Sequence, residues 1–143
     1  MKSSVAPLQI GRPILSNPDF FGWFVACGFD EKRIPSLHAT VAYSRAPVDW
    51  NVEPFLPRDG ELRLTDTKRE IRIFGGSHVV LTIPSASLSE RWRELTNAGA
   101  SWDFDDYVPH VSLGDPNDLS GKELVAFMGP IVLGGEYRRS ANA

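Results

Sequence analysis

The chain has 143 residues, a length typical of one folded domain, and its 42% hydrophobic and 23% charged residues are typical of a globular protein. A formal net charge of −3 argues against binding to long nucleic acid, although a pocket can still hold a small anion. The one cysteine excludes an internal disulfide. Without an apolar run of membrane-spanning length or a signal-like start, we expect a cytoplasmic protein with no membrane partner.

The N-terminal third predicts an arm followed by two strands. Three prolines in residues 1–20 predict an irregular arm that lies over the body. Residues 20–29 (FFGWFVACGF) predict a buried strand, because they are aromatic and β-branched and end at turn residues. Residues 30–36 are too few to form both a helix and the two turns that would connect it to its neighbours. Residues 37–44 (LHATVAYS) alternate and predict a strand, and residues 45–57 predict a proline-bearing loop.

The middle of the chain predicts a hairpin followed by a helix. Residues 61–74 alternate and predict one or two strands with a solvated face, and a Gly-Gly turn then leads into a strand over residues 78–83. A helix is predicted over residues 88–98, because Leu88, Trp92 and Leu95 share one helical face. Ser85 or Ser87 can cap its start.

The last third predicts a second strand with the character of residues 37–44. An acidic loop over residues 101–106 leads to this strand, residues 107–113 (YVPHVSL). A short helix is predicted over residues 119–127, and a last strand over residues 131–137. Helices and strands that do not alternate regularly place the chain in the α+β class.

Two of the three histidines stand in the same local pattern, His38-Ala39-Thr40 and His110-Val111-Ser112. Residues i and i+2 of a strand point to the same face, so each segment offers an imidazole and a hydroxyl side by side above an apolar floor. Two imidazoles can divide the roles of general base and general acid, and two hydroxyls can hold phosphate oxygens. One such motif is weak evidence, but two among three histidines are unlikely to arise by chance.

A metal site is the alternative interpretation of this region. Asp103, Asp105 and Asp106 closely precede His110, and carboxylates with an imidazole can bind divalent cations. The histidines lack the close ligand spacing of metal sites, so no metal and no cofactor are expected. His78 has no hydroxyl residue two positions later, and we expect it to be structural.

Paired His-x-Thr/Ser motifs on strands resemble those of the two-histidine phosphoesterase superfamily. Three longer stretches resemble its branch of phage anti-CBASS phosphodiesterases, which destroy host cyclic oligonucleotide messengers. They are residues 37–50 (LHATVAYSRAPVDW), 99–114 (GASWDFDDYVPHVSLG) and 129–137 (GPIVLGGEY). The resemblance implies one two-lobed domain over residues 1–143, with antiparallel sheets facing a central cleft and few helices outside. The family has a helix before the first motif, so the short segment 30–36 implies a trimmed first lobe.

The same resemblance implies an enzyme. It would hydrolyse 3′–5′ bonds of cyclic di- or trinucleotides without a metal, as a phage counter-defence protein in the host cytoplasm. Its catalytic groups would be His38, Thr40, His110 and Ser112.

For base recognition, the resemblance implies three further residues. Phe24 lies in a Phe-Val-Ala segment that matches a base-stacking aromatic of the branch, without its hydroxyl. Tyr107 would lie at the cleft rim, and Glu136 would accept a hydrogen bond from a base edge. A core position for Phe24 and a solvated one for Glu136 stay open as alternatives.

Two other functions also stay open. One is a 2′,3′-cyclic phosphodiesterase or 2′–5′ RNA-processing enzyme of the same superfamily. The other is a non-catalytic sponge that only binds cyclic nucleotides. The net charge argues against long RNA, and two complete motifs argue against the sponge, because a binder needs no base–acid pair.

Overall fold

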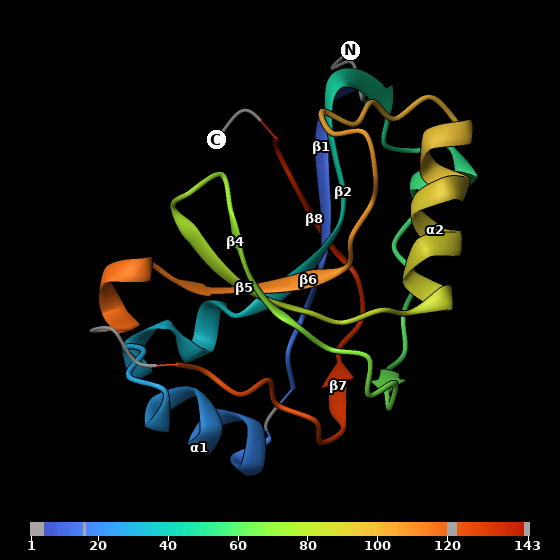
Figure 1. Ribbon diagram of the computed structural model, residues 1–143. Coiled ribbons are helices and arrows are strands. Elements are labelled where there is room, and N and C mark those ends of the chain that lie inside the picture. Colours follow the sequence, from blue (N-terminus) through green and yellow to red (C-terminus); the bar gives the residue numbers. More distant parts are fainter. Residues whose placement is uncertain (1–4, 16, 120–122, 142–143) are drawn as a thin grey trace.

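The computed structural model describes residues 5–15, 17–119 and 123–141, and its main element is a six-stranded antiparallel sheet in the order β4-β5-β6-β2-β1-β8 (Figure 1). Its strands are β1 (Val5–Pro13), β2 (His38–Asp49), β4 (Ile71–Phe74), β5 (His78–Thr82), β6 (His110–Gly114) and β8 (Tyr137–Arg139). A separate ribbon pairs β3 (Leu62–Leu64) with β7 (Ile131–Leu133). Both motif strands therefore belong to one sheet, and the two-lobed layout stays a prediction.

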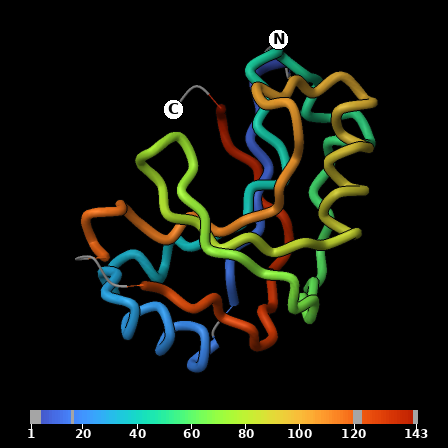
Figure 2. Tube along the Cα trace, viewed as in Figure 1, coloured from blue at the N-terminus to red at the C-terminus, as the bar shows by residue number. Residues whose placement is uncertain are grey.

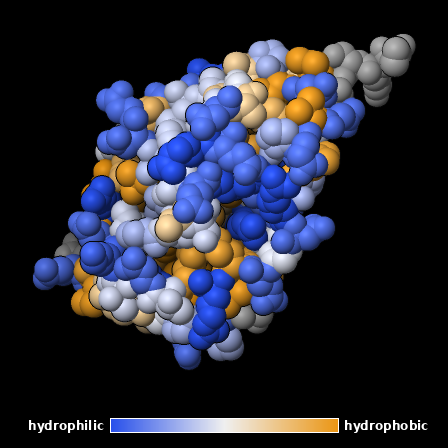
Figure 3. Space-filling model, turned by 90° about the vertical axis from the view of Figure 1, so that its right-hand side faces the viewer, coloured by the Kyte–Doolittle hydropathy of each residue, from blue (hydrophilic) through white to orange (hydrophobic). Residues whose placement is uncertain are grey.

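Two α-helices lie outside the strands in the described part of the chain, α1 (Pro18–Ala26) and α2 (Ala86–Asn97). They lie on different sides of the molecule (Figure 2). Each begins at a capping side chain: Asn17 accepts from the amide of Phe20, and Ser85 from that of Leu88. The face that carries α2 is mostly hydrophilic, with apolar atoms showing between polar side chains (Figure 3). Neither helix is long and apolar enough to cross a membrane.

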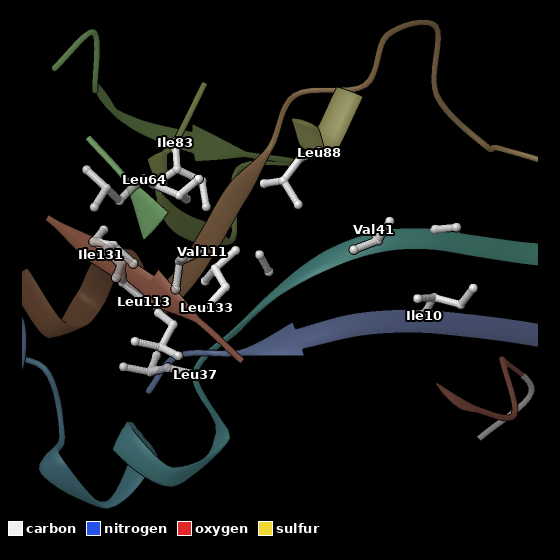
Figure 4. Close-up of a cluster of buried hydrophobic side chains, with 14 of the residues drawn as sticks. Ile10, Leu37, Val41, Leu64, Ile83, Leu88, Val111, Leu113, Ile131 and Leu133 are labelled. Carbon is white, nitrogen blue, oxygen red and sulfur yellow. The ribbon is translucent and has the colours of Figure 1, made fainter. Parts of the chain in front are cut away.

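The apolar floor that the two motifs predict is present. Ala39, Val41, Val111 and Leu113 are all 0% exposed. Val111 and Leu113 of β6 pack toward the β3–β7 ribbon, and this contact closes the core below the sheet (Figure 4). Burial of a valine or leucine side chain contributes about 1.5 to 3 kcal/mol, so this floor fixes which face of β2 and β6 points away from the core.

The predicted irregular N-terminal arm is wrong, because residues 5–13 form β1, which lies inside the sheet between β2 and β8. Its prolines occupy positions that a strand tolerates. Pro7 falls at a register shift against β2, and Pro13 is the last residue of the strand. Pro18 opens α1, where a missing amide hydrogen costs nothing.

The predicted strand over residues 20–29 is also wrong, because residues 18–26 form α1. Its buried side chains Phe20, Phe24 and Cys27 follow helical spacing, whereas Val25 is exposed. Aromatic content alone favoured a strand. Because α1 lies between β1 and β2, the first half of the chain has the helix that it was expected to lack, and the expectation of a trimmed lobe is overturned.

The remaining elements differ from prediction mainly in their ends. The Gly-Gly turn, the strand at 78–82 and helix α2 are confirmed. β2 continues to Asp49, into the expected loop. The expected last strand is two short strands in different sheets, β7 and β8. No helix forms over residues 123–127, and residues 120–122 lie outside the described part.

A buried ion pair joins α2 to the segment before β8. Arg91 donates from Nε to Oε2 of Glu136 at 2.9 Å and from a terminal nitrogen to Oε1 at 3.0 Å. The Glu136 side chain is 0% exposed and also accepts from the amide of Arg58. Arg91 further donates to the carbonyls of Pro54 and Leu56. Arg91 also pairs with the half-exposed carboxylate of Glu94, so the loss of Glu136 would remove the buried counter-charge of Arg91 and leave the exposed one.

We expect Glu136→Gln to lower the free energy of unfolding by about 1 to 3 kcal/mol, because it removes the buried carboxylate from Arg91 and leaves only the half-exposed Glu94 as counter-charge. Urea denaturation measures this change. Glu53→Gln is the matched control: its side chain is 74% exposed and pairs with Arg58, so stability should change little. Equal midpoints for the two variants would contradict a structural role for the buried pair.

Candidate active site

Strands β2 and β6 bring the two histidine motifs together. Ala39 pairs with Val111 in an antiparallel register. In this register His38 lies across from Ser112, and Thr40 lies across from His110. Since residues directly opposite one another share a face, all four polar side chains lie on the sheet face opposite the apolar floor. The structure thus gathers two imidazoles and two hydroxyls in one block.

Both imidazoles are oriented by the same contact. His38 Nδ1 lies 2.8 Å from the carbonyl oxygen of Ser36, and His110 Nδ1 lies 2.7 Å from that of Val108. A carbonyl oxygen only accepts, so Nδ1 carries the proton in each ring. The other nitrogen, Nε2, is therefore the basic atom of the neutral ring and the acidic atom of the charged ring.

His110 is the more enclosed of the two histidines. Burial lowers the pKa of His110 below its ordinary value, and the nearby His38 and His78 act in the same direction, while the hydrogen bond to Val108 acts against them. Phe74 forms part of the enclosure, with its ring centroid 4.8 Å from that of His110 at an angle of 75°. The neutral, base-competent form of His110 is thereby favoured.

A cavity of about 700 Å³ opens over this face. It is large enough for a nucleotide-sized ligand. Its walls come from β2, the β4–β5 hairpin, the acidic loop and β6. The lining includes Thr40, His110 and Ser112. His38 is not among the lining residues, but its neighbours Thr40 and Ser112 are.

A bulge in β2 adds Tyr43 to the same wall. The pairing of β1 with β2 shifts by one residue here. Ile10 pairs with Ala42, and the next residue of β1, Gly11, pairs with Thr40. One extra residue lets Thr40 and Tyr43 both face the cavity, although an odd number of positions separates them. Sequence alternation alone could not place Tyr43 there.

The acidic loop forms part of the rim of the cavity. Asp103 pairs with Arg45 at 2.9 Å, and both line the cavity. Phe104, 71% exposed, lies edge-on to Trp102 with ring centroids 5.7 Å apart. Within the described residues, no three His, Cys, Asp or Glu side chains gather as a metal-binding group.

Phe24 does not reach the cavity. Its side chain is 0% exposed on α1 and stacks on Phe29 with ring centroids 5.1 Å apart. No face of the ring is open to a base, so the alternative interpretation as a core phenylalanine describes it. The aromatic side chains that do line the cavity are Tyr43, Phe74, Trp102 and Phe104.

Tyr107 and Glu136 support the site from behind. The Tyr107 hydroxyl donates to the carbonyl of Thr40 at 2.8 Å, and its ring stacks on Trp92. Burial raises the pKa of Tyr107, which keeps this hydroxyl protonated as a donor. Both carboxylate oxygens of Glu136 accept hydrogen bonds from Arg91 or from the amide of Arg58. Its position therefore does not fit the expected contact with a base.

Comparison with known proteins identifies the family of the chain. Residues 27–143 match the family model of the anti-CBASS protein Acb1. The chain is 34% identical to the Acb1 protein of Sphingomonas paeninsulae over 91% of its own length, which is 22% of that relative. It is 33% identical to the Acb1 proteins of Salmonella phage S16 and Enterobacteria phage T4, over 71% of its own length and 64% of theirs. The chain thus spans less than two thirds of the length of these relatives. It belongs to the anti-CBASS protein Acb1 family.

Proposed function

We propose that this protein is a metal-independent phosphodiesterase that hydrolyses 3′–5′ bonds of cyclic di- or trinucleotides. The observation that carries the proposal is the pairing of Ala39 with Val111, from which it follows that two imidazoles and two hydroxyls share one face of the sheet. The relatives are named anti-CBASS proteins, which supports a phage counter-defence role for this chain. The 700 Å³ cavity supports a small substrate rather than a long strand.

The first step needs one base and one acid. Nε2 of His110 removes the proton from the ribose 2′-OH, and the resulting oxygen attacks phosphorus. The bond from phosphorus to the 5′ oxygen breaks, and that oxygen takes a proton from Nε2 of His38. The product is a 2′,3′-cyclic phosphate, which water opens with the two histidines in exchanged roles.

The pKa of His110, lowered by burial, supports its assignment as the first base. Thr40 and Ser112 stand across the strands from the imidazoles and can donate to the non-bridging phosphate oxygens. Every proton in the scheme has a donor and an acceptor in the chain or the substrate, so no step requires a metal ion.

We expect His38→Ala and His110→Ala each to lower turnover by at least about a hundredfold, the usual contribution of one acid–base group. Thr40→Ala and Ser112→Ala should cost about tenfold to a hundredfold, since each removes one donor among several. Chromatography of cyclic dinucleotide products gives the rates. Thr96→Ala is the matched control for the hydroxyl variants, because Thr96 lies on α2 and is not among the residues that line the cavity. Wild-type turnover in either motif variant would rule out the paired-histidine scheme.

The acid limb of the kcat/KM profile should have its midpoint below pH 6.5, the ordinary pKa of histidine. His110 must be neutral to accept the 2′-OH proton, so activity rises as pH passes upward through its lowered pKa. Phe74→Ala admits water beside the ring and should move the midpoint up toward 6.5. A wild-type midpoint above 6.5 would contradict His110 as the first base.

The identity of the nucleophile gives a further prediction. A cyclic dinucleotide of ribonucleotides should be cut in EDTA with a 2′,3′-cyclic phosphate as intermediate. The same ring without its 2′-OH should bind and stay intact, because it lacks the attacking group. A 2′,3′-cyclic-phosphate RNA tested in parallel distinguishes the RNA-processing alternative. Hydrolysis of the deoxy ring at the ribose rate would show that water attacks directly, and loss of all activity in EDTA would show that a metal is needed.

A further inference from the structure

The ring of Tyr137 lies across a neighbouring strand. Tyr137 of β8 pairs with Gly11 of β1. A Cβ atom on Gly11 would stand 2.5 Å from the Tyr137 hydroxyl oxygen and 2.7 Å from Cζ. The ring therefore fills the space that any side chain at position 11 would occupy. A glycine at this position lets a side chain from β8 reach over β1 toward β2.

This reach ends beside the two motifs. Gly11 is also the pairing partner of Thr40, and Pro13 is the partner of His38. The rings of Tyr137 and His38 lie 6.2 Å apart at an angle of 72°. The phenol oxygen thus lies over Gly11, on the sheet face that carries Thr40 and His38. Tyr137 had no role in the sequence motifs, since only the pairing of β8 with β1 brings it here.

The Tyr137 hydroxyl has no hydrogen-bond partner among the described residues. The other two tyrosines use theirs: Tyr43 donates to the carbonyl of Ala141, and Tyr107 to that of Thr40. Tyr137 is partly buried, and burial raises the pKa of its hydroxyl, which stays a donor at neutral pH. A donor that no protein group occupies is free to exchange its water for an oxygen atom of a ligand.

Arg139 holds the ring from the adjoining position on β8. Its guanidinium carbon lies 5.7 Å from the centroid of Tyr137, within cation–π range. Its Nε donates to Oε1 of Gln9 at 2.9 Å, which fixes the guanidinium. The ring thus lies between a glycine and a fixed cation, so its hydroxyl has a defined position before any ligand binds.

We propose that Tyr137 is a substrate-binding residue whose hydroxyl donates to a non-bridging oxygen of the scissile phosphate, as a third hydroxyl beside Thr40 and Ser112. This assignment rests on the proposed phosphodiester chemistry. Its ligand class is a phosphate diester or monoester. A phenol held in place before binding adds a donor without the cost of ordering a flexible side chain.

Tyr137→Phe tests the hydroxyl alone, because it keeps the ring over Gly11. We expect kcat on the cyclic dinucleotide to fall about tenfold, as for one donor among several, and KM to rise as well, because the same hydroxyl contacts the bound phosphate. The acid limb of the pH profile should not move, because the hydroxyl acts on the phosphate and not on a histidine. Unchanged kcat would overturn the assignment, and a shifted acid limb would make Tyr137 a positioning residue for His38 instead.

Gly11→Ala tests the geometry, because the new methyl group displaces the ring. It should lower kcat at least as much as Tyr137→Phe, with thermal unfolding measured alongside. Gly22→Ala is the matched control: its Cβ meets nothing within 4 Å on α1, and activity should stay at the wild-type value. Wild-type kcat in a folded Gly11→Ala protein would overturn the assignment.

Binding of inorganic phosphate separates this inference from the proposed function. The imidazole NMR signals of His38 and His110 report phosphate binding without turnover. We expect the Kd for phosphate to rise about tenfold in Tyr137→Phe. Equal affinities would overturn the assignment whatever the activity. If the wild-type protein cleaves no cyclic nucleotide but Tyr137→Phe binds phosphate more weakly than the wild type, the tyrosine assignment is supported and the proposed function fails.

Discussion

The pairing of Ala39 with Val111 is the constraint on which the site depends. Both side chains are fully buried, so the hydrophobic floor holds the register of β2 against β6. A slip of either strand by one residue would turn the histidine of that strand into the core and its buried apolar residue, Ala39 or Val111, into the cavity. The energy that packs the core therefore also positions the polar groups above it.

The backbone supplies the rest of the order around the imidazoles. Carbonyl oxygens of Ser36 and Val108, each two residues before a histidine, fix which ring nitrogen is protonated. A third carbonyl, that of Thr40, is held by Tyr107, whose ring stacks on Trp92 of α2. Trp92 and Tyr107, which do not line the cavity, thus support it through the main chain of Thr40. Replacing a motif side chain would leave these main-chain contacts in place.

The sequence predicted the motif strands, the shared face of His38, Thr40, His110 and Ser112, and the capped helix α2, because local periodicity and spacing determine these features. Other features depend on distant partners. β1 was missed because it contains two prolines. A strand tolerates them only where its pairing is shifted or ends, and the pairing with β2 provides such positions at Pro7 and Pro13. Glu136 was expected at a base edge, but Arg91 takes up its charge. Phe24 was expected in a cleft because short motifs carry no information on burial. The positions of Tyr43 and Tyr137 near the motifs could not be predicted, because they depend on a bulge in β2 and on the pairing of β8 with β1.

The distance along the chain between the two histidine strands has a consequence for how the protein folds. Nearly half of the chain separates β2 from β6. Bringing the two strands together loses loop-closure entropy before their contacts can stabilise the pair. Helices α1 and α2 can form early from local contacts, but neither contains a histidine. A partly folded chain therefore has helix without a site. During refolding, helical signal should precede the proposed activity, and the return of that activity would mark the closure of the loop between β2 and β6.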